Sequence, residues 1–583
     1  MIESRRKNEK IIGLLLEDIG SDFSKELVKS IVSAIPANRN IRIVVLPGKH
    51  IENSEPEWLH AYKRVYNTVF GFADTCDLDG FIIHLGSLSE RDKANTIIHG
   101  NKYMNVRSKP MVFVASDMKD YVTVNYDNEA GIREAVEYLV NVGGVKKLCM
   151  LGGRDNNKDA RARKAIFACC LAEYGISFRE KNFVHTDMTA NCEKEAGRLL
   201  DNNPDVQAVF CVNDAVAKGL YDAMKKRDLV PGRDIQVFGF DNTRMSSELI
   251  PALTSIGAES ISLGQRAFEL LLAMLGGIEV KSAVVPTRLY GRASLMYDMH
   301  DYTTFEMVNV VPSFVYRVFD DIFYRYKSEY ISREMVDLRR LFYEILSRML
   351  FAMKRRYMSE ETFEELGLMI DKFFEKGAMD YTDAGKLLKS IQHLQDGMND
   401  ASHSMAAVVK INRLFLRMKD KAICALAEEN TSHKEEYQKL RTNMQEFIAA
   451  STADTEGKEG IFRSFDKLGI DNAALYVYEK PLIYDDEKRT PFPEYALLRC
   501  VVRSGELYLL SNERRRCPIS ELFSRSELPN VKTGYATFPV FCGDNIYGLL
   551  LCGLTGDIYD KGEYIASQIG RSMRISEKQE CMS

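Results

Sequence analysis

Between residues 10 and 294 the sequence alternates short, β-branched apolar runs with longer amphipathic segments. The amphipathic pieces, at 132–142, 163–174 and 215–226, carry apolar residues at helical spacing. Such alternation is typical of right-handed βαβ units and predicts parallel sheets, in which ligands bind beyond the carboxyl ends of the strands. The predicted strands are 11–16, 41–46, 80–84, 110–114, 147–151, 208–212 and 235–240.

Polar side chains follow several of these predicted strands. Carboxylates accept hydrogen bonds, a guanidinium donates in a fork and an amide does both, so together they suit a polyhydroxylated or otherwise polar small molecule. A single Asp after a strand is also typical of a helix N-cap, and the prediction therefore depends on the whole set. The candidate ligand-binding residues are Asp18, Phe23, Ser116, Arg163, Asn213 and Asp241.

Motifs spread through this region resemble the effector-binding core of the LacI/GalR repressors. They stand in the order VTVNYDN at 122–128, LGG at 151–153, VND at 212–214, FGFDN at 238–242 and GRAS at 291–294. The resemblance covers roughly half of the chain. It implies a pair of Rossmann-like lobes, as in a periplasmic sugar-binding protein, that close on a ligand in the cleft between them.

Carried over residue by residue, the resemblance makes Arg163, Asn213 and Asp241 the leading ligand contacts. The sequence departs from the family pattern at Ala115, where the family often has Asp, and at Ile166, where a Gly usually follows the Arg. The segment 185–189 also lacks the aromatic ring on which several members stack a sugar or a base. These departures leave the class of ligand open.

The start of the chain differs from the family as well. LacI/GalR members begin with a helix-turn-helix and a hinge helix, which place a recognition helix in the major groove. Here ten residues precede the first apolar run, and Arg5, Arg6 and Lys7 are typical of a solvated charge cluster. We therefore expect that this chain does not bind operator DNA in the family's manner.

A helical pattern replaces the strands after residue 297. Apolar residues recur at helical spacing, and Ser359 followed by Glu360 and Glu361 predicts an N-cap with an acidic first turn. The periodicity predicts a helical connector over 298–422 whose aromatic and Met side chains form a core.

Residues 423–451 carry a heptad pattern. Asn430 falls at a core position, where a lone Asn favours a parallel two-stranded register. We expect a coiled-coil dimerisation helix here, and the alternative is a helix packed on its own domain with Asn430 at its margin. The predicted dimer seam consists of Ile423, Leu426, Asn430, Tyr437 and Leu440.

The last part of the chain, 454–575, predicts a small α+β domain. Strands are expected at 473–478, 495–502, 507–510, 537–541 and 547–552, with a hairpin turn at 542–545 and a final helix at 559–576. Its closing motifs are similar to the end of GAF domains. The predicted architecture is thus a two-lobed α/β sensor over 10–297, the connector, the dimerisation helix and a GAF-like domain.

Composition narrows the function classes. With 78 Lys and Arg against 83 Asp and Glu, the net charge of −5 gives no global attraction for nucleic acid or anionic membranes. The 12 Cys form no C-x-x-C pair and the 9 His no short metal-binding motif, which indicates reduced thiols and no metal site. The apolar run near the N-terminus, 11–16, is too short for a secretory signal or a membrane span.

These features predict a cytoplasmic, non-enzymatic sensor of a sugar-like or other polar metabolite, dimeric and without a cofactor. We find no nucleophile–base pair, P-loop or G-x-S-x-G in the sequence, so no catalytic residue is proposed. We expect a separate protein to supply the output, since no diguanylate cyclase or kinase motif follows. The alternative is a transcriptional regulator that acts on DNA through an unrecognised surface or a partner.

Overall fold

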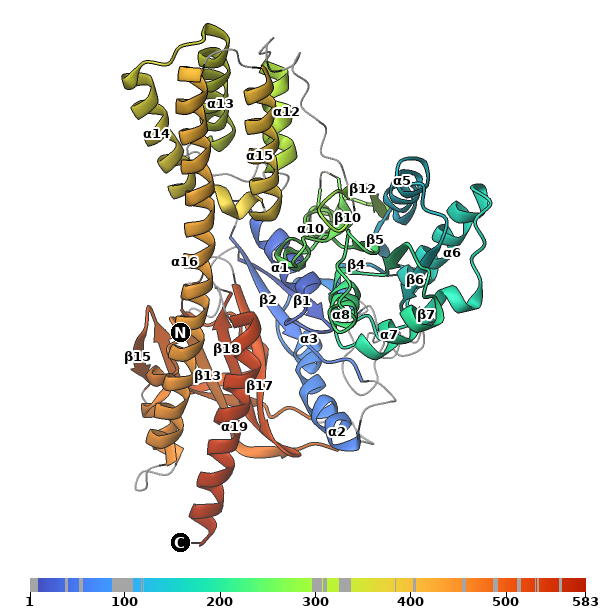
Figure 1. Cartoon of the computed structure of the whole chain (residues 1–583). Coiled ribbons are helices and arrows are strands. Elements are labelled where there is room, and N and C mark those ends of the chain that lie inside the picture. Colours follow the sequence, from blue (N-terminus) through green and yellow to red (C-terminus); the bar gives the residue numbers. More distant parts are fainter. Residues whose placement is uncertain are drawn as a thin grey trace.

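The computed structural model shows two α/β lobes, a helical bundle and a C-terminal α+β region (Figure 1). Within the part it describes, we find no helix with enough consecutive apolar residues to cross a lipid bilayer. The described residues are 9–36, 40–51, 56–85, 109–116, 118, 120–259, 261–295, 307, 312–323, 337–382, 384–401, 405–452, 458–485, 491–510, 515–529, 531, 534–554 and 558–582.

The first lobe is built on parallel strands in the order β11-β5-β4-β3-β1-β2. The inner strands are almost fully buried because helices cover the sheet, which explains their unbroken apolar runs. The strands are β1 (Lys10–Leu16), β2 (Ile41–Pro47), β3 (Gly80–His84), β4 (Met111–Val114), β5 (Val122–Tyr126) and β11 (Ala283–Val285), and the helices are α1 (Asp22–Ser33), α2 (Glu57–Tyr66), α3 (Phe72–Thr75) and α10 (Leu263–Leu275).

The second lobe has its own sheet, in the order β12-β10-β9-β8-β6-β7. Every pairing in it is parallel except that of β10 with β12. Its strands are β6 (Leu148–Gly152), β7 (Phe183–His185), β8 (Ala208–Cys211), β9 (Gln236–Phe240), β10 (Thr254–Ala258) and β12 (Thr287–Tyr290), and its helices are α5 (Asn128–Asn141), α6 (Lys158–Glu173), α7 (Glu193–Asn202), α8 (Asp214–Lys225) and α9 (Arg244–Glu248).

The chain passes between the two sheets more than once. It leaves the first sheet after β5, returns to it at β11 and ends in the second sheet at β12. The two-lobed α/β architecture expected from the sequence is therefore confirmed. Each of the seven predicted strands corresponds to a strand of one of these two sheets.

The middle of the chain forms a helical bundle around a core of its own. Ser359 caps α14 by accepting a hydrogen bond from the Thr362 N–H, as the sequence predicts. The helices are α12 (Pro312–Ile322), α13 (Leu338–Arg355), α14 (Glu360–Glu375), α15 (Ala384–Ala401) and α16 (Met405–Thr452).

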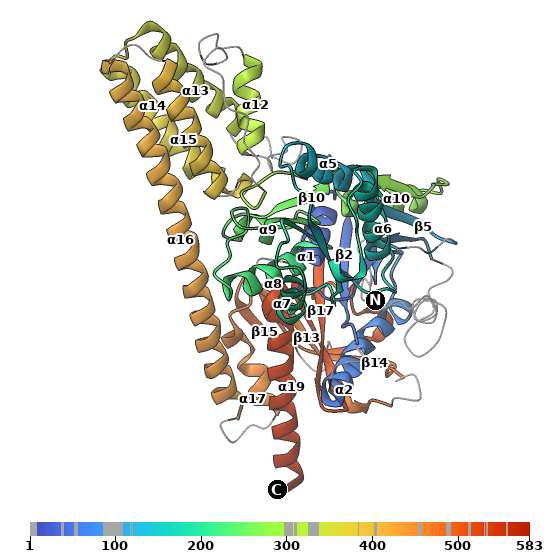
Figure 2. The ribbon, with the colours of Figure 1, turned by 45° about the vertical axis from the view of Figure 1, so that its right-hand side comes forward.

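Helix α16 runs without a break through residue 423, where we expected a new segment to begin. It extends from the bundle down to the C-terminal region (Figure 2). At its lower end Leu440 packs against the first hydrophobic core of the chain, and Met444 and Phe447 are buried in that core. The heptad prediction is corrected there, because intrachain packing takes these positions.

Of the other four predicted seam positions, the structure describes the side chain of one. Ile423 is exposed. The side chains of Leu426, Asn430 and Tyr437 lie outside the described part of the structure.

The C-terminal region forms an antiparallel sheet with the strand order β17-β18-β13-β14-β15. Its predicted hairpin is present, since Cys542 pairs with Asn545 across a two-residue turn that Gly543 opens with a φ of 59°. The elements are α17 (Lys458–Arg463), β13 (Asn472–Ile483), β14 (Tyr495–Arg503), β15 (Glu506–Leu509), β16 (Arg516–Pro518), β17 (Gly534–Cys542), β18 (Asn545–Gly553) and α19 (Ile558–Met582).

This sheet is continuous with that of the first lobe. Strand β17 pairs in parallel with β2, with Gly534 opposite Ile43 (Figure 1). With β16, which pairs with β14, twelve of the described strands therefore form one sheet. The buried Arg42 binds Glu9 at 2.7 Å and donates to the Phe523 carbonyl at 2.7 Å. Two hydrophobic cores contain side chains from both regions. The C-terminal region and the first lobe therefore pack as one body, whereas the sequence predicted separate domains.

Candidate functional site

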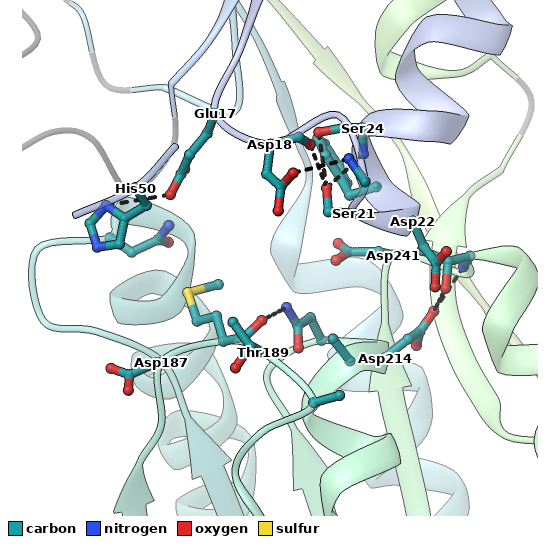
Figure 3. A pocket seen from close by; sticks show the side chains of 18 of the residues that line it. Glu17, Asp18, Ser21, Asp22, Ser24, His50, Asp187, Thr189, Asp214 and Asp241 are labelled. Atoms are coloured by element: carbon teal, nitrogen blue, oxygen red, sulfur yellow. Dashed lines mark hydrogen bonds and ion pairs between the residues drawn. The ribbon is translucent and has the colours of Figure 1, made fainter. Parts of the chain in front are cut away.

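A pocket of about 800 Å³ lies between the two lobes, at the carboxyl ends of strands from both sheets. Glu17 and Asp18 lie on the wall from the first lobe, and Asp187 and Thr189 lie on the wall from the second (Figure 3). Its position is the one that a two-lobed parallel fold predicts for a ligand.

Five of the six predicted ligand-binding residues line this pocket: Asp18, Phe23, Arg163, Asn213 and Asp241. Ser116 does not, and the prediction is corrected at that position. The segment there is held by its backbone, because the Ser116 N–H donates to Asn125 Oδ1 at 2.9 Å and its carbonyl accepts from Lys158 Nζ at 3.2 Å. The latter bond links the two lobes.

Arg163, on α6, is buried, and each of its guanidinium nitrogens has an acceptor within the protein. Nε donates to Asn128 Oδ1 at 3.0 Å, Nη1 to the Val212 carbonyl at 2.6 Å and Nη2 to Asp241 Oδ1 at 3.3 Å. The guanidinium also lies 3.5 Å from the centroid of the Phe240 ring. Its main contacts therefore hold the pocket wall together, whereas the sequence suggested a fork offered to the ligand.

Asp241 follows β9 with a φ of 96°, a conformation that L residues rarely adopt. Burial raises the pKa of its carboxyl, and the neighbouring Arg163 opposes that rise. Arg163 Nη2 contacts Oδ1, one of the two oxygens of this carboxyl. The carboxyl is thus a buried hydrogen-bonding group that is positioned by Arg163 and directed into the pocket (Figure 3).

Asn213 is the N-cap of α8. Its Oδ1 accepts from the Val216 N–H at 2.9 Å, and its Nδ2 donates to the Met188 carbonyl at 3.0 Å. The next residue, Asp214, accepts from Thr243 and from Ser255, and burial raises its pKa to about 7. Both side chains consequently shape the floor of the pocket from α8.

Two histidines of the first lobe also line the pocket, and the sequence analysis did not select them. His84 ends β3 and packs against Phe23, with ring centroids 4.7 Å apart. Burial lowers its pKa to about 4, and its Nδ1 has no hydrogen-bond partner among the described residues. The sequence signal was present, because His84 is the last residue of a predicted strand. A neutral imidazole there can bind a ligand group.

The charges around the pocket are unequal. Among the described residues that line it are seven carboxyl groups and four Lys or Arg side chains. Arg154 lies 4.0 Å from Glu17 across the cleft and donates to the Asp187 carbonyl at 2.8 Å. The cationic groups of Arg154, Arg163 and Lys49 thus face protein acceptors, and the pocket offers more acceptors than donors. In the described part of the chain no cluster of three or more His, Cys, Asp or Glu is placed to hold a metal ion.

Residues 136–295 match the model of the periplasmic binding protein-like domain. The chain is 26% identical over 294 residues to the catabolite control protein A of Priestia megaterium, which covers 49% of this chain and 82% of that protein. It is 32% identical over 139 residues to the ribose operon repressor of Escherichia coli K12, covering 24% of this chain and 42% of the repressor. It is 24% identical over 282 residues to the transcriptional repressor CytR of the same strain, covering 48% and 76%.

The solved structures that match this chain include a complex of the transcriptional regulator CelR with cellobiose, at 20% identity and a TM-score of 0.40 over 50% of this chain and 86% of that one. A sugar-binding LacI-family regulator from Enterococcus faecalis has 23% identity and a TM-score of 0.39 over 50% and 99%. Together with the family model, the curated relatives show that residues 136–295 form a periplasmic-binding-protein-like domain of the LacI/GalR regulator type. These relatives are regulators, not enzymes.

Proposed function

We propose that this protein is a LacI/GalR-type sensor that binds a small polar ligand between its two lobes. The observation that carries the proposal is the pocket of about 800 Å³, lined by Asp18, Phe23, Arg163, Asn213 and Asp241 at the carboxyl ends of two parallel sheets. The relatives include a ribose operon repressor and a catabolite control protein, which supports a regulatory role in metabolism. A ligand that contacts both lobes favours their closed arrangement.

The charges of the pocket favour a ligand rich in hydrogen-bond donors. Carboxyl groups outnumber cationic groups along the lining, and the main cations already face protein acceptors. A phosphate would meet this negative excess, while Lys49, Arg154 and Arg163 of the described lining already contact protein acceptors. We therefore expect neutral polyols, nucleosides or amines to bind, and sugar phosphates to bind poorly.

A thermal-shift screen tests the proposal. The panel contains sugars, nucleosides, amines and amino acids, together with sugar phosphates as the class expected to fail. A ligand at a thousandfold excess over its Kd stabilises the folded state by about 4 kcal/mol, which gives a clear rise in Tm.

Each hit is tested again with Asp241→Asn, because Asn tolerates a positive φ and has nearly the same size, while its amide replaces the carboxylate and its charge. The control is Asp234→Asn in the same lobe, where the carboxylate pairs with Arg233 outside the pocket. The rise in Tm should disappear with the first variant and remain with the second. If a ligand raises the Tm of both variants, it binds outside the assigned site, and the assignment is contradicted.

We further propose that the protein is a homodimer joined along the upper part of α16. Val409, Leu416 and Ile423 are exposed by 44%, 57% and 53%, and they follow one another at seven-residue intervals. Residues so spaced lie along one helix face, as in a coiled coil. This stripe continues the predicted seam upstream, while the seam below Leu440 packs within the chain.

Sedimentation or light scattering at micromolar concentration checks the dimer. The double variant Leu416→Glu/Ile423→Glu places charges on both sides of the contact and should yield monomers. The control is Ile483→Glu, which alters an isoleucine that is 73% exposed on β13, in the C-terminal sheet and not in the helical bundle. A monomeric wild-type protein, or a double variant that stays dimeric, would contradict this interface.

Transcription is the process that the named relatives regulate. The net charge of −5 gives this chain no global attraction for DNA. We propose that the response is passed to a partner protein, which contacts the first lobe or the C-terminal region, and that this region is GAF-like. Retention of DNA by the purified protein in a gel shift at low salt would favour direct action instead.

A further inference from the structure

Lys49 follows β2 and lines the pocket with most of its side chain buried. Its Nζ lies 3.1 Å from Asp18 Oδ1, in the pocket, and 2.7 Å from Glu563 Oε2, on α19. A single ammonium group therefore joins a pocket carboxylate to a carboxylate near the other end of the chain. Burial would lower the pKa of Lys49, but Asp18 and Glu563 together raise it, so the group is charged.

Hydrogen bonds to Asn67 fix the backbone of Lys49, while its ammonium group contacts two carboxylates. Its N–H donates to Asn67 Oδ1 at 2.7 Å, and its carbonyl accepts from Asn67 Nδ2 at 2.9 Å. The ammonium is held by the two carboxylates, so its position depends on how strongly each attracts it.

The side chain of Glu563 is held in place by a second contact. Its other oxygen, Oε1, accepts a hydrogen bond from the Tyr62 hydroxyl at 2.9 Å, and the Tyr62 ring lies 5.1 Å from the Phe541 ring of β17. The loop after β1 is also close to the first turn of α19, since a Cβ on Gly20 would lie 3.9 Å from the Tyr559 carbonyl oxygen. The pocket loop and α19 are therefore direct neighbours.

We propose that Glu563 is a positioning residue of the ligand pocket, which acts through Lys49 and couples the state of the Asp18 loop to α19. This inference rests on the proposed function, since it names the route by which a bound ligand is sensed by the C-terminal region. A ligand group that donates a hydrogen bond to Asp18 competes with Lys49 there, and the Lys49 ammonium then moves toward Glu563. Conversely, movement of α19 that withdraws Glu563 shifts Lys49 onto Asp18. Such a coupling is reciprocal by thermodynamic necessity.

Hydrogen–deuterium exchange in the ligand-free, full-length protein tests the coupling. Glu563→Gln keeps the size of the side chain but removes its charge, and it should speed exchange in segment 18–24 about fivefold. The matched control is Glu577→Gln on the same helix, where the carboxylate pairs with Tyr547 and Arg574 and not with Lys49. Asp18→Asn should raise exchange in the first two turns of α19 by a similar factor.

A Lys49→Met background separates a positioning role from a general structural one. If Glu563 acts through Lys49, Glu563→Gln should have no further effect on segment 18–24 once Lys49 is absent. Equal effects of the Glu563 and Glu577 variants, or an effect of Glu563→Gln that persists in Lys49→Met, would overturn the inference.

The readout distinguishes this inference from the proposed function. Exchange coupling without any hit in the ligand screen would contradict the sensor proposal alone. If a ligand binds at Asp241 but Glu563→Gln leaves the exchange rate of segment 18–24 unchanged, the coupling alone is overturned.

Discussion

Arg163→Ala is expected to lower the free energy of unfolding by about 3 kcal/mol and to weaken ligand binding by roughly a hundredfold. The variant removes three hydrogen bonds at once and leaves Asp241 buried without its cation. The carboxyl of Asp241 then loses the contact that aims it into the pocket. Urea denaturation measures the loss of stability, and calorimetry with a ligand found by the screen measures the affinity.

The loss of stability should depend on pH in a defined direction. Burial already raises the pKa of Asp241 above the value of an unfolded chain, and removing Arg163 raises it further. A carboxyl whose pKa is raised by folding costs stability as the pH rises from the unfolded pKa through the folded one. Arg163→Ala should therefore be less destabilising at pH 5 than at pH 8.

The control for this variant is Arg161→Ala on the same helix, where the side chain is exposed and donates to the Asp155 carbonyl. It should change stability by less than about 1 kcal/mol. If the two arginine variants behave alike, Arg163 does not organise the pocket wall. A loss of stability that grows toward low pH would likewise argue against the buried Asp241 as its cause.

Gly534→Ala is expected to destabilise the protein by roughly 3 kcal/mol, because it strains the junction between the first lobe and the C-terminal sheet. Gly534 has a φ of 117°, and a Cβ there would lie 2.0 Å from the Ile43 carbonyl oxygen. Since the neighbour is backbone, β17 must move away from β2 to make room. Chemical denaturation measures the effect, and hydrogen exchange at 43–45 locates it.

A second glycine separates the clash from the backbone conformation. Gly505 has a φ of 81°, with no atom within 4 Å of the place that a Cβ would take. Gly505→Ala therefore carries only the conformational cost of a positive φ, about 1 kcal/mol. Equal losses of stability in the two variants would show that the β2–β17 contact contributes little.

Local patterns in the sequence predicted much of the fold. Buried parallel strands require unbroken apolar runs, and each of the seven runs identified from residues 11 to 240 is a strand of the two lobes. Five described strands of the two lobes were not predicted. Three of them, β7, β11 and β12, have only three or four residues, too few for a pattern to stand out. In the other two, β5 (VTVNY) and β10 (TSIGA), polar residues interrupt the apolar run. Capping signals such as Ser359 were also local, and they were interpreted correctly.

The candidate site was predicted in part for the same reason. Residues that follow parallel strands must meet at one edge, so Asp18, Asn213 and Asp241 could be selected without coordinates. Their partners could not be selected in this way. The acceptors around Arg163 and the ring contact between Phe23 and His84 depend on side-chain directions that spacing does not specify.

The sequence by itself determined the elements of this protein, the two-lobed parallel fold and the edge at which polar side chains gather, because these follow from short-range patterns of apolar and polar residues. Only the tertiary structure decided that β17 adds to β2, that the end of the heptad seam packs within the chain, and that Lys49 joins Asp18 to Glu563. These contacts link residues far apart in the chain. They depend on which strand edges and charged groups the tertiary structure brings together, and this leaves no periodic pattern in the sequence.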